Sequence, residues 1–154
     1  MSKNLSPVII KTFHELDKEE LYKFIQLRIE VFVVEQDCPY QDLDNLDMQG
    51  RHIWIEEEEK ILSYLRLNPP GTRFDEPSLG RIVTKDTIRS RGLAEIIINK
   101  ALEIIDKDYS MPTRISAQSH LEDYYSKFDF VKCSEEYMED NIPHIEMLRD
   151  VKDK

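Results

Sequence analysis

The chain has 154 residues, of which 40% are hydrophobic and 34% are charged. This length fits one domain, expected over 1–154, because a typical domain takes roughly 100–200 residues. The recurring apolar residues exclude intrinsic disorder for most of the chain. Lysine and arginine number 21 against 31 aspartates and glutamates, giving a net charge of −10. That balance argues against a nucleic-acid partner, which needs a basic face.

Cysteine use and hydropathy indicate the compartment. Cys38 and Cys133 match no metal or redox spacing and are expected to be reduced thiols, although the sequence leaves a disulfide between them open. The longest apolar run covers only 31–34, far short of the roughly 20 residues that span a bilayer. The first seven residues lack the apolar segment of a signal peptide. We therefore expect a cytoplasmic protein with no membrane partner.

Apolar periodicity predicts strands and helices in alternation. Asp17 can cap a helix that begins at Lys18, and Pro112 separates the long amphipathic helix from the following strand. In chain order the predicted elements are a strand at 8–13, a helix from 18 to 32, a loop at 36–50, strands at 52–55 and 61–67 joined by a turn at 57–60, a loop at 68–78, a strand at 79–84, a helix at 92–107, a strand at 114–117, a helix at 121–128, and strands at 131–133 and 143–148. This order predicts an α/β (α+β) fold, with one mixed sheet and helices on both faces.

The segment 80–94 carries the clearest chemical signal. A strand leads through a short basic loop into a helix start, where free amides and the helix dipole favour an anion. Gly92 lets the backbone approach a phosphate closely. The loop has a local charge of +3 on a chain of −10, from Arg81, Lys85, Arg89 and Arg91 against Asp86. This polarity favours an anion site; the alternative is a capped helix start with solvated arginines.

Two common phosphate motifs are absent here. The segment has no Gly-Lys-Ser/Thr of a P-loop and no G-x-G-x-x-G of a dinucleotide fold. The spacing Arg89-x-x-Gly92-x-Ala94 instead resembles the pyrophosphate-binding segment of the GNAT acetyltransferase superfamily, Q/R-x-x-G-x-G/A.

Three further segments resemble the ElaA-like branch of that superfamily. They are Leu27 to Tyr40, Ser116 to Phe130, and Glu136 to Met147, so the resemblance covers about residues 21–148 in the expected order. The sequence departs from the family in two places. The connector from Val83 to Arg89 is one residue longer than usual, and Asp129 replaces a common glycine. Such a position often needs φ > 0, which Asp tolerates better than most residues.

The resemblance implies transfer of an acetyl group from acetyl-CoA by direct attack of an amine. It also implies two splayed central parallel strands, here 79–84 and 114–117, between which the pantetheine chain binds. The Val83 amide would polarise the thioester carbonyl, and the amides of 91–94 would hold the pyrophosphate. The cofactor-binding residues implied in this way are Ile82, Val83, Thr84, Arg89, Ser90, Arg91, Gly92, Leu93 and Ala94.

The departing thiolate needs a proton, and a tyrosine on the helix 121–128 can supply it. Spacing alone does not choose between Tyr124 and Tyr125, whereas the family resemblance implies Tyr125 as the general acid. The alternative is that both tyrosines belong to the packed face of that helix.

A base that deprotonates the incoming amine is less clearly marked. The candidates for the base are Glu30, Glu35, His52 and His120, and these residues with Gln118 are the candidate substrate contacts. Either glutamate could instead be a solvated charge. His52 enters a strand and could be a satisfied core histidine.

The loop at 36–50 contains Asp42, Asp44 and Asp47, which could attract a cationic amine. Its similarity to a calcium loop fails because a strand-like segment follows where an EF-hand has a helix. His14, His120 and His144 show no metal-ligand spacing, so no metal is predicted.

The sequence therefore predicts an acetyl-CoA-dependent N-acetyltransferase that acts on a small-molecule amine. The alternative is a catalytically silent module of the same fold that binds CoA or another protein. The acceptor, the acyl chain length and the choice between monomer and homodimer stay open.

Overall fold

The structure is a computed structural model that describes residues 7–152, apart from the side chain of Ser90. The expectation that there is no signal peptide rests on residues 1–7, and all of these except Pro7 lie outside the described range. The strands are β1 (Val8–Thr12), β2 (Arg51–Glu57), β3 (Lys60–Asn68), β4 (Ser78–Thr84), β5 (Thr113–Gln118), β6 (Val131–Lys132), β7 (Tyr137–Glu139) and β8 (Ile142–Arg149). The helices are α1 (Lys18–Arg28), α2 (Leu93–Asp108) and α3 (Glu122–Ser126), with short helical segments η1 (Phe13–Glu15), η2 (Ile29–Glu35), η3 (Asp86–Arg91) and η4 (Ser119–Leu121).

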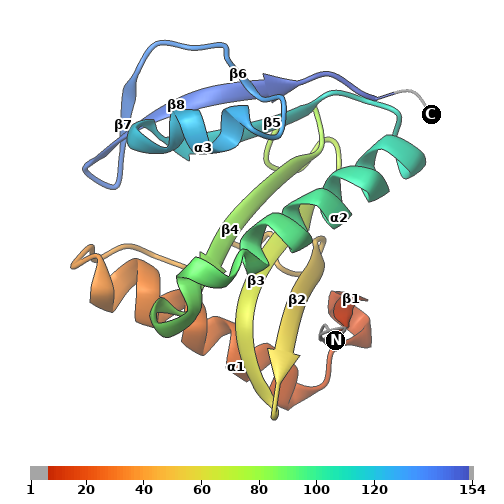
Figure 1. Ribbon diagram of the computed structural model, residues 1–154, viewed down its shortest axis with the longest axis vertical. Coiled ribbons are helices and arrows are strands. Elements are labelled where there is room, and N and C mark those ends of the chain that lie inside the picture. Colours follow the sequence, from red (N-terminus) through yellow and green to blue (C-terminus); the bar gives the residue numbers. More distant parts are fainter. Residues whose placement is uncertain (1–6, 153–154) are drawn as a thin grey trace.

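The strands form one mixed sheet in the order β1-β2-β3-β4-β5-β8-β6, and β7 pairs with β8. Only β4 and β5 are parallel neighbours, and the other pairs are antiparallel. The predicted mixed sheet is therefore confirmed. Figure 1 shows the sheet dividing after β4 into a part built from β1 to β4 and a part built from β5 to β8.

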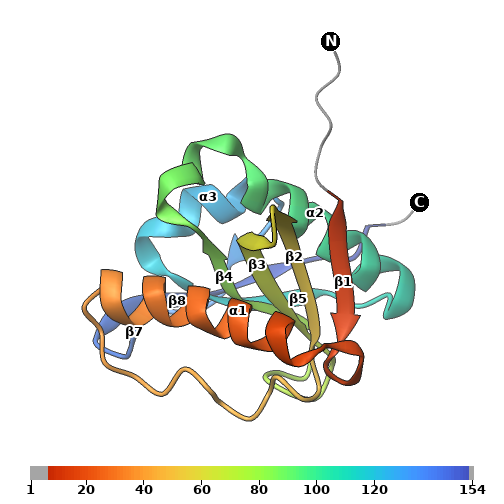
Figure 2. The same ribbon diagram turned by 90° about the horizontal axis from the view of Figure 1, so that it is seen from below.

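Helices cover both faces of this sheet, as predicted (Figure 2). On one face, Phe24 and Leu27 of α1 pack with Trp54 and Tyr64 of the sheet. On the other face, α2 and α3 pack against the larger apolar cluster, which includes buried residues from β2 to β5 and β8. The amphipathic stripe of α2 has Ile97, Ile98, Ala101, Leu102 and Ile105 buried.

Local chemistry explains where α1 begins and ends. The Asp17 side chain accepts a hydrogen bond from the Glu20 amide, and the Glu20 side chain accepts one from the Asp17 amide, which satisfies two donors at the helix start. The predicted helix to residue 32 is α-helical only to Arg28. It continues as the π-helical segment η2, which is rich in β-branched residues whose stiff side chains fit a regular α-helix poorly.

The strand β7 was not predicted, because its three residues lie in a stretch interpreted as an acidic turn. It forms a hairpin with β8 through Asp140 and Asn141, whose φ angles are 52° and 63°. Two successive residues with φ > 0 are the requirement of a type I′ turn, for which Asp and Asn are suited. The Asp-Asn pair was thus the available signal for this hairpin.

The structure also bears out the expected backbone at Asp129. Its φ is 71°, in the left-handed region that a glycine commonly occupies in the family. Asp129 closes the turn after α3, where its amide donates to the Ser126 carbonyl. The helix predicted at 121–128 is shorter in the structure. A 3-10 turn forms at Ser119–Leu121, and the α-helix α3 then covers only Glu122–Ser126.

Candidate active site

The main cleft of the described residues opens where β4 and β5 separate. The two strands pair only at Ser78 and Arg114, and the Arg114 amide donates to the Pro77 carbonyl at 3.0 Å. Beyond that point they diverge, and a cleft of about 510 Å³ is lined by residues 79–84 of β4 and 115–118 of β5. The predicted splay of the central parallel strands is therefore present.

A β-bulge distorts β4 at the wall of this cleft. Tyr64 lies opposite Val83 and Arg66 lies opposite Gly80, so two residues of β4 face one residue of β3. One of the two, Arg81, has a φ of 53°, which is unfavourable for a residue with a Cβ atom. A bulge interrupts the hydrogen-bond ladder locally and is common beside functional sites.

The side chain of Arg81 anchors this bulge to the loop before β2. Its Nη2 donates to the Asp42 carbonyl at 2.9 Å and to Asp44 Oδ2 at 3.2 Å. The guanidinium also lies over the ring of Tyr40, 5.4 Å from its centroid. These contacts offset the backbone strain and fix the position of β4 at the cleft.

The helix α2 begins at the mouth of the cleft and leaves its first amides available. Gly92 is its N-cap with φ 74°, and no side chain that the structure describes caps this helix end. Such free amides with the helix dipole suit an anion. The Leu93 side chain is buried in the core, whereas Ala94 lines the cleft. The backbone of Ser90 lies in η3, and its side chain is outside the described structure.

The basic residues of this loop are paired with acidic groups from other parts of the chain. Arg89 Nη1 lies 2.6 Å from Glu35 Oε2, Arg91 Nη2 lies 3.0 Å from Glu57 Oε2, and Lys85 lies 3.6 Å from Glu30. Arg81 is bound to the acidic loop, as described above. The partners come from distant elements, so the sequence count missed them. Backbone amides are therefore the main groups that this helix start offers to an anion, and Arg89 lines the same cleft.

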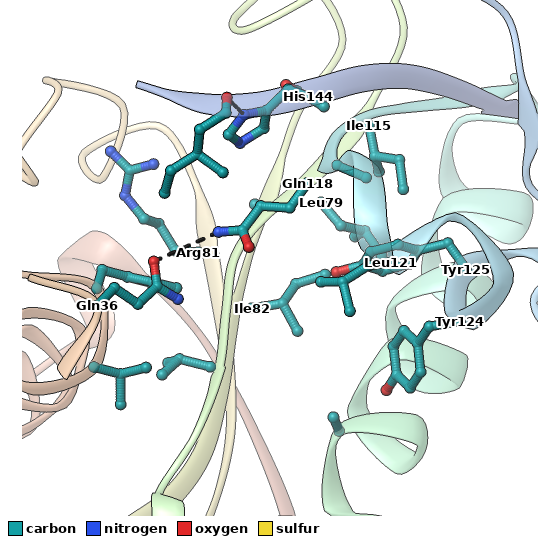
Figure 3. Close-up of a pocket in the computed structure, with 18 of the residues that line it drawn as sticks. Gln36, Leu79, Arg81, Ile82, Ile115, Gln118, Leu121, Tyr124, Tyr125 and His144 are labelled. Carbon is teal, nitrogen blue, oxygen red and sulfur yellow. Dashed lines mark hydrogen bonds between the residues drawn. The ribbon is translucent and has the colours of Figure 1, made fainter. Parts of the chain in front are cut away.

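The two adjacent tyrosines of α3 differ in their hydroxyl contacts. Tyr124 donates to Glu95 Oε2 at 2.7 Å, and burial, with this hydrogen bond, raises the pKa of Tyr124. Tyr125 lines the cleft at 8% exposure, and among the described residues none forms a hydrogen bond with its hydroxyl. Burial raises the pKa of Tyr125 to about 12, so this phenol stays protonated at neutral pH. Figure 3 shows both tyrosines on the side of the cleft opposite Gln36.

The structure brings three of the five candidate substrate residues to the cleft. Glu35, Gln118 and His120 line it, and the Gln118 amide donates across it to Gln36 at 3.5 Å, as Figure 3 shows. The Glu35 carboxylate is occupied by Arg89, whose hydrogen bond and charge lower the pKa of Glu35. Glu30 does not line the cleft and faces Lys85.

His52 does not reach the cleft, so its prediction as a substrate contact or base is wrong. Its side chain is fully buried in β2 and stacks on Phe24, with ring centroids 4.8 Å apart. One ring nitrogen lies 2.7 Å from the Tyr64 hydroxyl and the other 2.9 Å from the Asp47 carbonyl. Burial lowers the pKa of His52, which makes it a neutral core histidine.

The acidic loop does not present free carboxylates to a substrate, contrary to one sequence expectation. Asp47 accepts from Arg28 Nη1 at 2.7 Å and from Arg66 Nη1 at 2.9 Å, and Asp44 accepts from Arg66 at 2.8 Å. Arg28 also donates to Asp42 at 2.9 Å. With Arg81, three arginines balance three aspartates. Sequence analysis missed this network, whose partners lie up to 39 residues apart.

Two further residues at the cleft were missed, Glu139 of β7 and His144 of β8. They are brought together by the unpredicted hairpin, with His144 Nε2 3.5 Å from Glu139 Oε2. Among residues 7–152 no group of three His, Cys, Asp or Glu side chains could hold a metal ion. No helix within that range is long and apolar enough to cross a membrane.

Comparison with known proteins identifies the class of this fold. The acetyltransferase (GNAT) domain family matches residues 14–151, and the chain belongs to that family. The fold and the family are those of acyl-CoA-dependent N-acyltransferases, with acyl-CoA as the cosubstrate.

Individual relatives agree on the ElaA-like branch, which confirms the predicted resemblance. Protein ElaA of Escherichia coli (strain K12) is 36% identical over 140 residues, which cover 89% of this chain and 92% of ElaA. The crystal structure of E. coli ElaA matches with a TM-score of 0.88 and 32% identity over 95% of this chain and 100% of that chain. The crystal structure of an acyl-CoA N-acyltransferase from Pseudomonas aeruginosa matches with a TM-score of 0.89 and 39% identity over 94% of this chain and 99% of that chain.

Proposed function

We propose that this protein is a cytoplasmic N-acetyltransferase that moves the acetyl group of acetyl-CoA to the amine of a small molecule. The observation that carries the proposal is the cleft between β4 and β5, which leads to the start of α2, where no described side chain caps the helix. An extended thioester chain fits such a gap because the separated strands leave backbone groups of β4 without a partner strand on that side.

In this proposal, the donor binds along β4 and ends at α2. Backbone groups of Ile82 and Thr84 pair with pantetheine, and the amides of 91–94 hold the pyrophosphate. The predicted donor, the Val83 amide, faces β3 instead, because Val83 pairs with Tyr64 two residues before Lys85, whose amide donates to the Leu62 carbonyl of β3. A neighbouring β4 amide that faces the cleft, such as that of Thr84, donates to the thioester carbonyl oxygen as negative charge develops there. A preorganised donor of this kind contributes about 10²–10³ in rate.

Tyr125 is the proposed general acid that protonates the departing thiolate. Its hydroxyl is uncommitted among the described residues, whereas the Tyr124 hydroxyl already donates to Glu95. A raised pKa does not prevent this role, because the proton must stay on the phenol until the C–S bond breaks. A positioned acid contributes roughly 10²–10⁴-fold.

Calorimetric titration with acetyl-CoA tests the donor site, with 3′-dephospho-CoA and adenosine as controls. Binding that weakens with salt and is lost in Gly92→Glu supports the site, because the new carboxylate would lie beside the bound pyrophosphate. No binding at millimolar acetyl-CoA would refute the proposal and leave only the fold.

Thiol release from acetyl-CoA with a panel of amines tests the reaction and separates an enzyme from a silent binding module. We expect Tyr125→Phe to lower turnover by about 10²-fold or more. Tyr22→Phe is the matched control, because this exposed tyrosine lies on the outer side of α1, away from the cleft. Loss of activity in Tyr124→Phe with full activity in Tyr125→Phe would transfer the role to Tyr124.

A further inference from the structure

The cleft passes through the sheet and therefore has two differently built halves. The α2 and α3 side holds Ala94, Leu121 and Tyr125, where the proposed donor site lies. On the other side, Gln118 extends towards Gln36, next to the end of η2. Figure 3 shows His144, Gln118 and Arg81 on this second side of β4, away from the tyrosines. If the proposed function holds, the amine must approach from this second side.

His144 belongs to the acceptor half because of its register in the sheet. It pairs directly with Gln118 in the β5–β8 ladder, so the two side chains leave the sheet on the same face. The neighbouring residues of β8, Ile145 and Met147, point to the opposite face and join the core with α2. His144 lines the cleft although it is only 7% exposed.

A hydrogen bond fixes which nitrogen of His144 can act as a base. Nδ1 lies 2.7 Å from the Ile142 carbonyl oxygen, which can only accept, so Nδ1 carries the proton. Nε2 of the neutral ring is therefore the basic nitrogen. It lies 3.5 Å from the Glu139 carboxylate, which favours the imidazolium formed when Nε2 takes up a proton.

Several charged and titratable groups surround this ring. On β7, the Tyr137 ring stacks on the imidazole at a centroid distance of 6.2 Å, and its hydroxyl bonds Ser116. Glu139 also accepts from Arg73 at 3.1 Å. The other charged and titratable residues that line the cleft are Glu35, Cys38, Tyr40, Arg81, Arg89, Glu95, His120, Tyr124, Tyr125 and Asp140.

The other candidate bases fit this role less well. Glu35 is neutralised by Arg89, and His52 is buried in the core. Glu30 does not line the cleft. His120 lines it but is exposed, and among the described residues no hydrogen bond fixes its ring.

We propose that His144 is the general base for the acceptor amine, an inference that rests on the proposed function. His144 Nε2 removes one proton from the ammonium group, and the free amine attacks the thioester carbon. A C–N bond forms and the C–S bond breaks with its electron pair on sulfur. The sulfur atom then takes a proton from the Tyr125 hydroxyl. The nitrogen atom loses a second proton, which protonates the Tyr125 phenolate again, and His144 releases its proton to solvent.

His144→Asn tests this role, since the asparagine amide can still donate to the Ile142 carbonyl but carries no basic nitrogen. Thiol release from acetyl-CoA is measured with spermidine, tyramine, L-lysine and glucosamine between about pH 6 and about pH 10, a range that covers histidine and aliphatic amines. We expect kcat/KM at neutral pH to fall about 10²–10⁴-fold. The kcat/KM of the variant should continue to rise with pH as more of the amine is unprotonated. The difference in kcat/KM between the wild type and the variant should therefore become smaller at high pH.

Matched variants separate the base from a structural effect. His14→Asn changes an exposed histidine of η1 outside the cleft and should leave both rate and profile unchanged. The affinity for acetyl-CoA, measured by calorimetry, should be the same in His144→Asn as in the wild type. Glu139→Gln should lower kcat/KM for the amine without changing the affinity for acetyl-CoA, because the imidazolium formed in the reaction loses its carboxylate partner.

The outcomes distinguish the two proposals. Wild-type activity with an unchanged rate and profile in His144→Asn would overturn the role of His144 and leave the proposed function standing. An unchanged kcat/KM for the amine in Glu139→Gln would also count against it, even if His144→Asn does not fold. No thiol release by the wild type with any amine would overturn the proposed function, and this inference with it.

Discussion

Replacing Asp47 with asparagine should destabilise the protein strongly. The Asp47 carboxylate accepts from Arg28 Nη1 and Nη2 at 2.7 and 3.3 Å and from Arg66 Nη1 at 2.9 Å. All three side chains are buried, with 6%, 0% and 1% exposure for Asp47, Arg28 and Arg66. Asparagine removes one negative charge and turns an amide donor towards guanidinium donors.

Breaking a buried ion pair in this way costs about 3–5 kcal/mol, because the remaining charge stays buried without compensation. Against a total stability of roughly 5–15 kcal/mol this is a large fraction. For a domain of this size 1 kcal/mol corresponds to roughly 2–4 °C, so the melting temperature should fall by about 6–20 °C. Thermal and urea unfolding followed by circular dichroism measure the change.

Asp108→Asn is the matched control. Asp108 forms an ion pair with Arg51 at 2.9 Å, but the two side chains are 35% and 30% exposed. An exposed pair contributes about 0–1 kcal/mol, so the melting temperature should fall by less than about 4 °C. If Asp47→Asn cost no more than Asp108→Asn, the network would not stabilise the fold as argued here.

The same network predicts the acid dependence of stability. Burial by itself would raise the pKa of Asp44, but the hydrogen bonds and charge of Arg66 outweigh it and hold the pKa at about 2. The pKa of Asp47 is also lowered, by Arg28 and Arg66 against its burial. Groups with a depressed pKa in the folded state stabilise it above their unfolded pKa of about 4 and lose this effect as pH falls. The stability of Asp47→Asn should therefore depend less on pH in that acidic range.

Three smaller changes test the phosphate loop and one turn. Gly92→Ala should lower the free energy of unfolding by about 1–2 kcal/mol and weaken acetyl-CoA binding, because the φ of 74° is unfavourable for a residue with a Cβ atom. Space is not the reason, since the new Cβ would meet only Glu95 Oε1 at 3.7 Å. An unchanged stability and affinity would mean that this backbone carries no strain. Glu35→Gln should tighten acetyl-CoA binding a few-fold in calorimetry by freeing Arg89 for the phosphates, and weaker binding would contradict that reason. Asp129→Ala should lower the free energy of unfolding by about 1 kcal/mol, whereas Asp129→Gly should be nearly neutral, because glycine adopts the φ of 71° without strain. Equal losses of stability in the two variants would instead assign the effect to the ion pair with Lys152.

The local features of the fold were predictable because they follow from short sequence patterns. The cap at Asp17, the stripe of α2 and the left-handed turn at Asp129 each depend on residues a few positions apart. The splayed strands followed from the family resemblance, since nothing in the composition of β4 or β5 shows that they separate.

Pairing across the chain was not predictable from the same patterns. The local charge near Gly92 suggested free arginines, but Glu35 and Glu57 lie 54 and 34 residues from their partners. The proposed base was missed for a related reason, since His144 meets Glu139 only through a hairpin with a three-residue strand. A sequence gives the number of charges, whereas the fold decides which of them meet.

The acidic loop and the bulge in β4 are two parts of one structural device. A left-handed φ at Arg81 costs roughly 1–2 kcal/mol, which a free strand would not keep. The Asp42 carbonyl and the Asp44 carboxylate hold the Arg81 side chain, and Asp44 is in turn held by Arg66 of β3. The aspartates that could have served to attract an amine thus act on β4 instead. They keep its wall distorted beside the cleft, where the proposed donor and acceptor sites approach each other from opposite faces of the sheet.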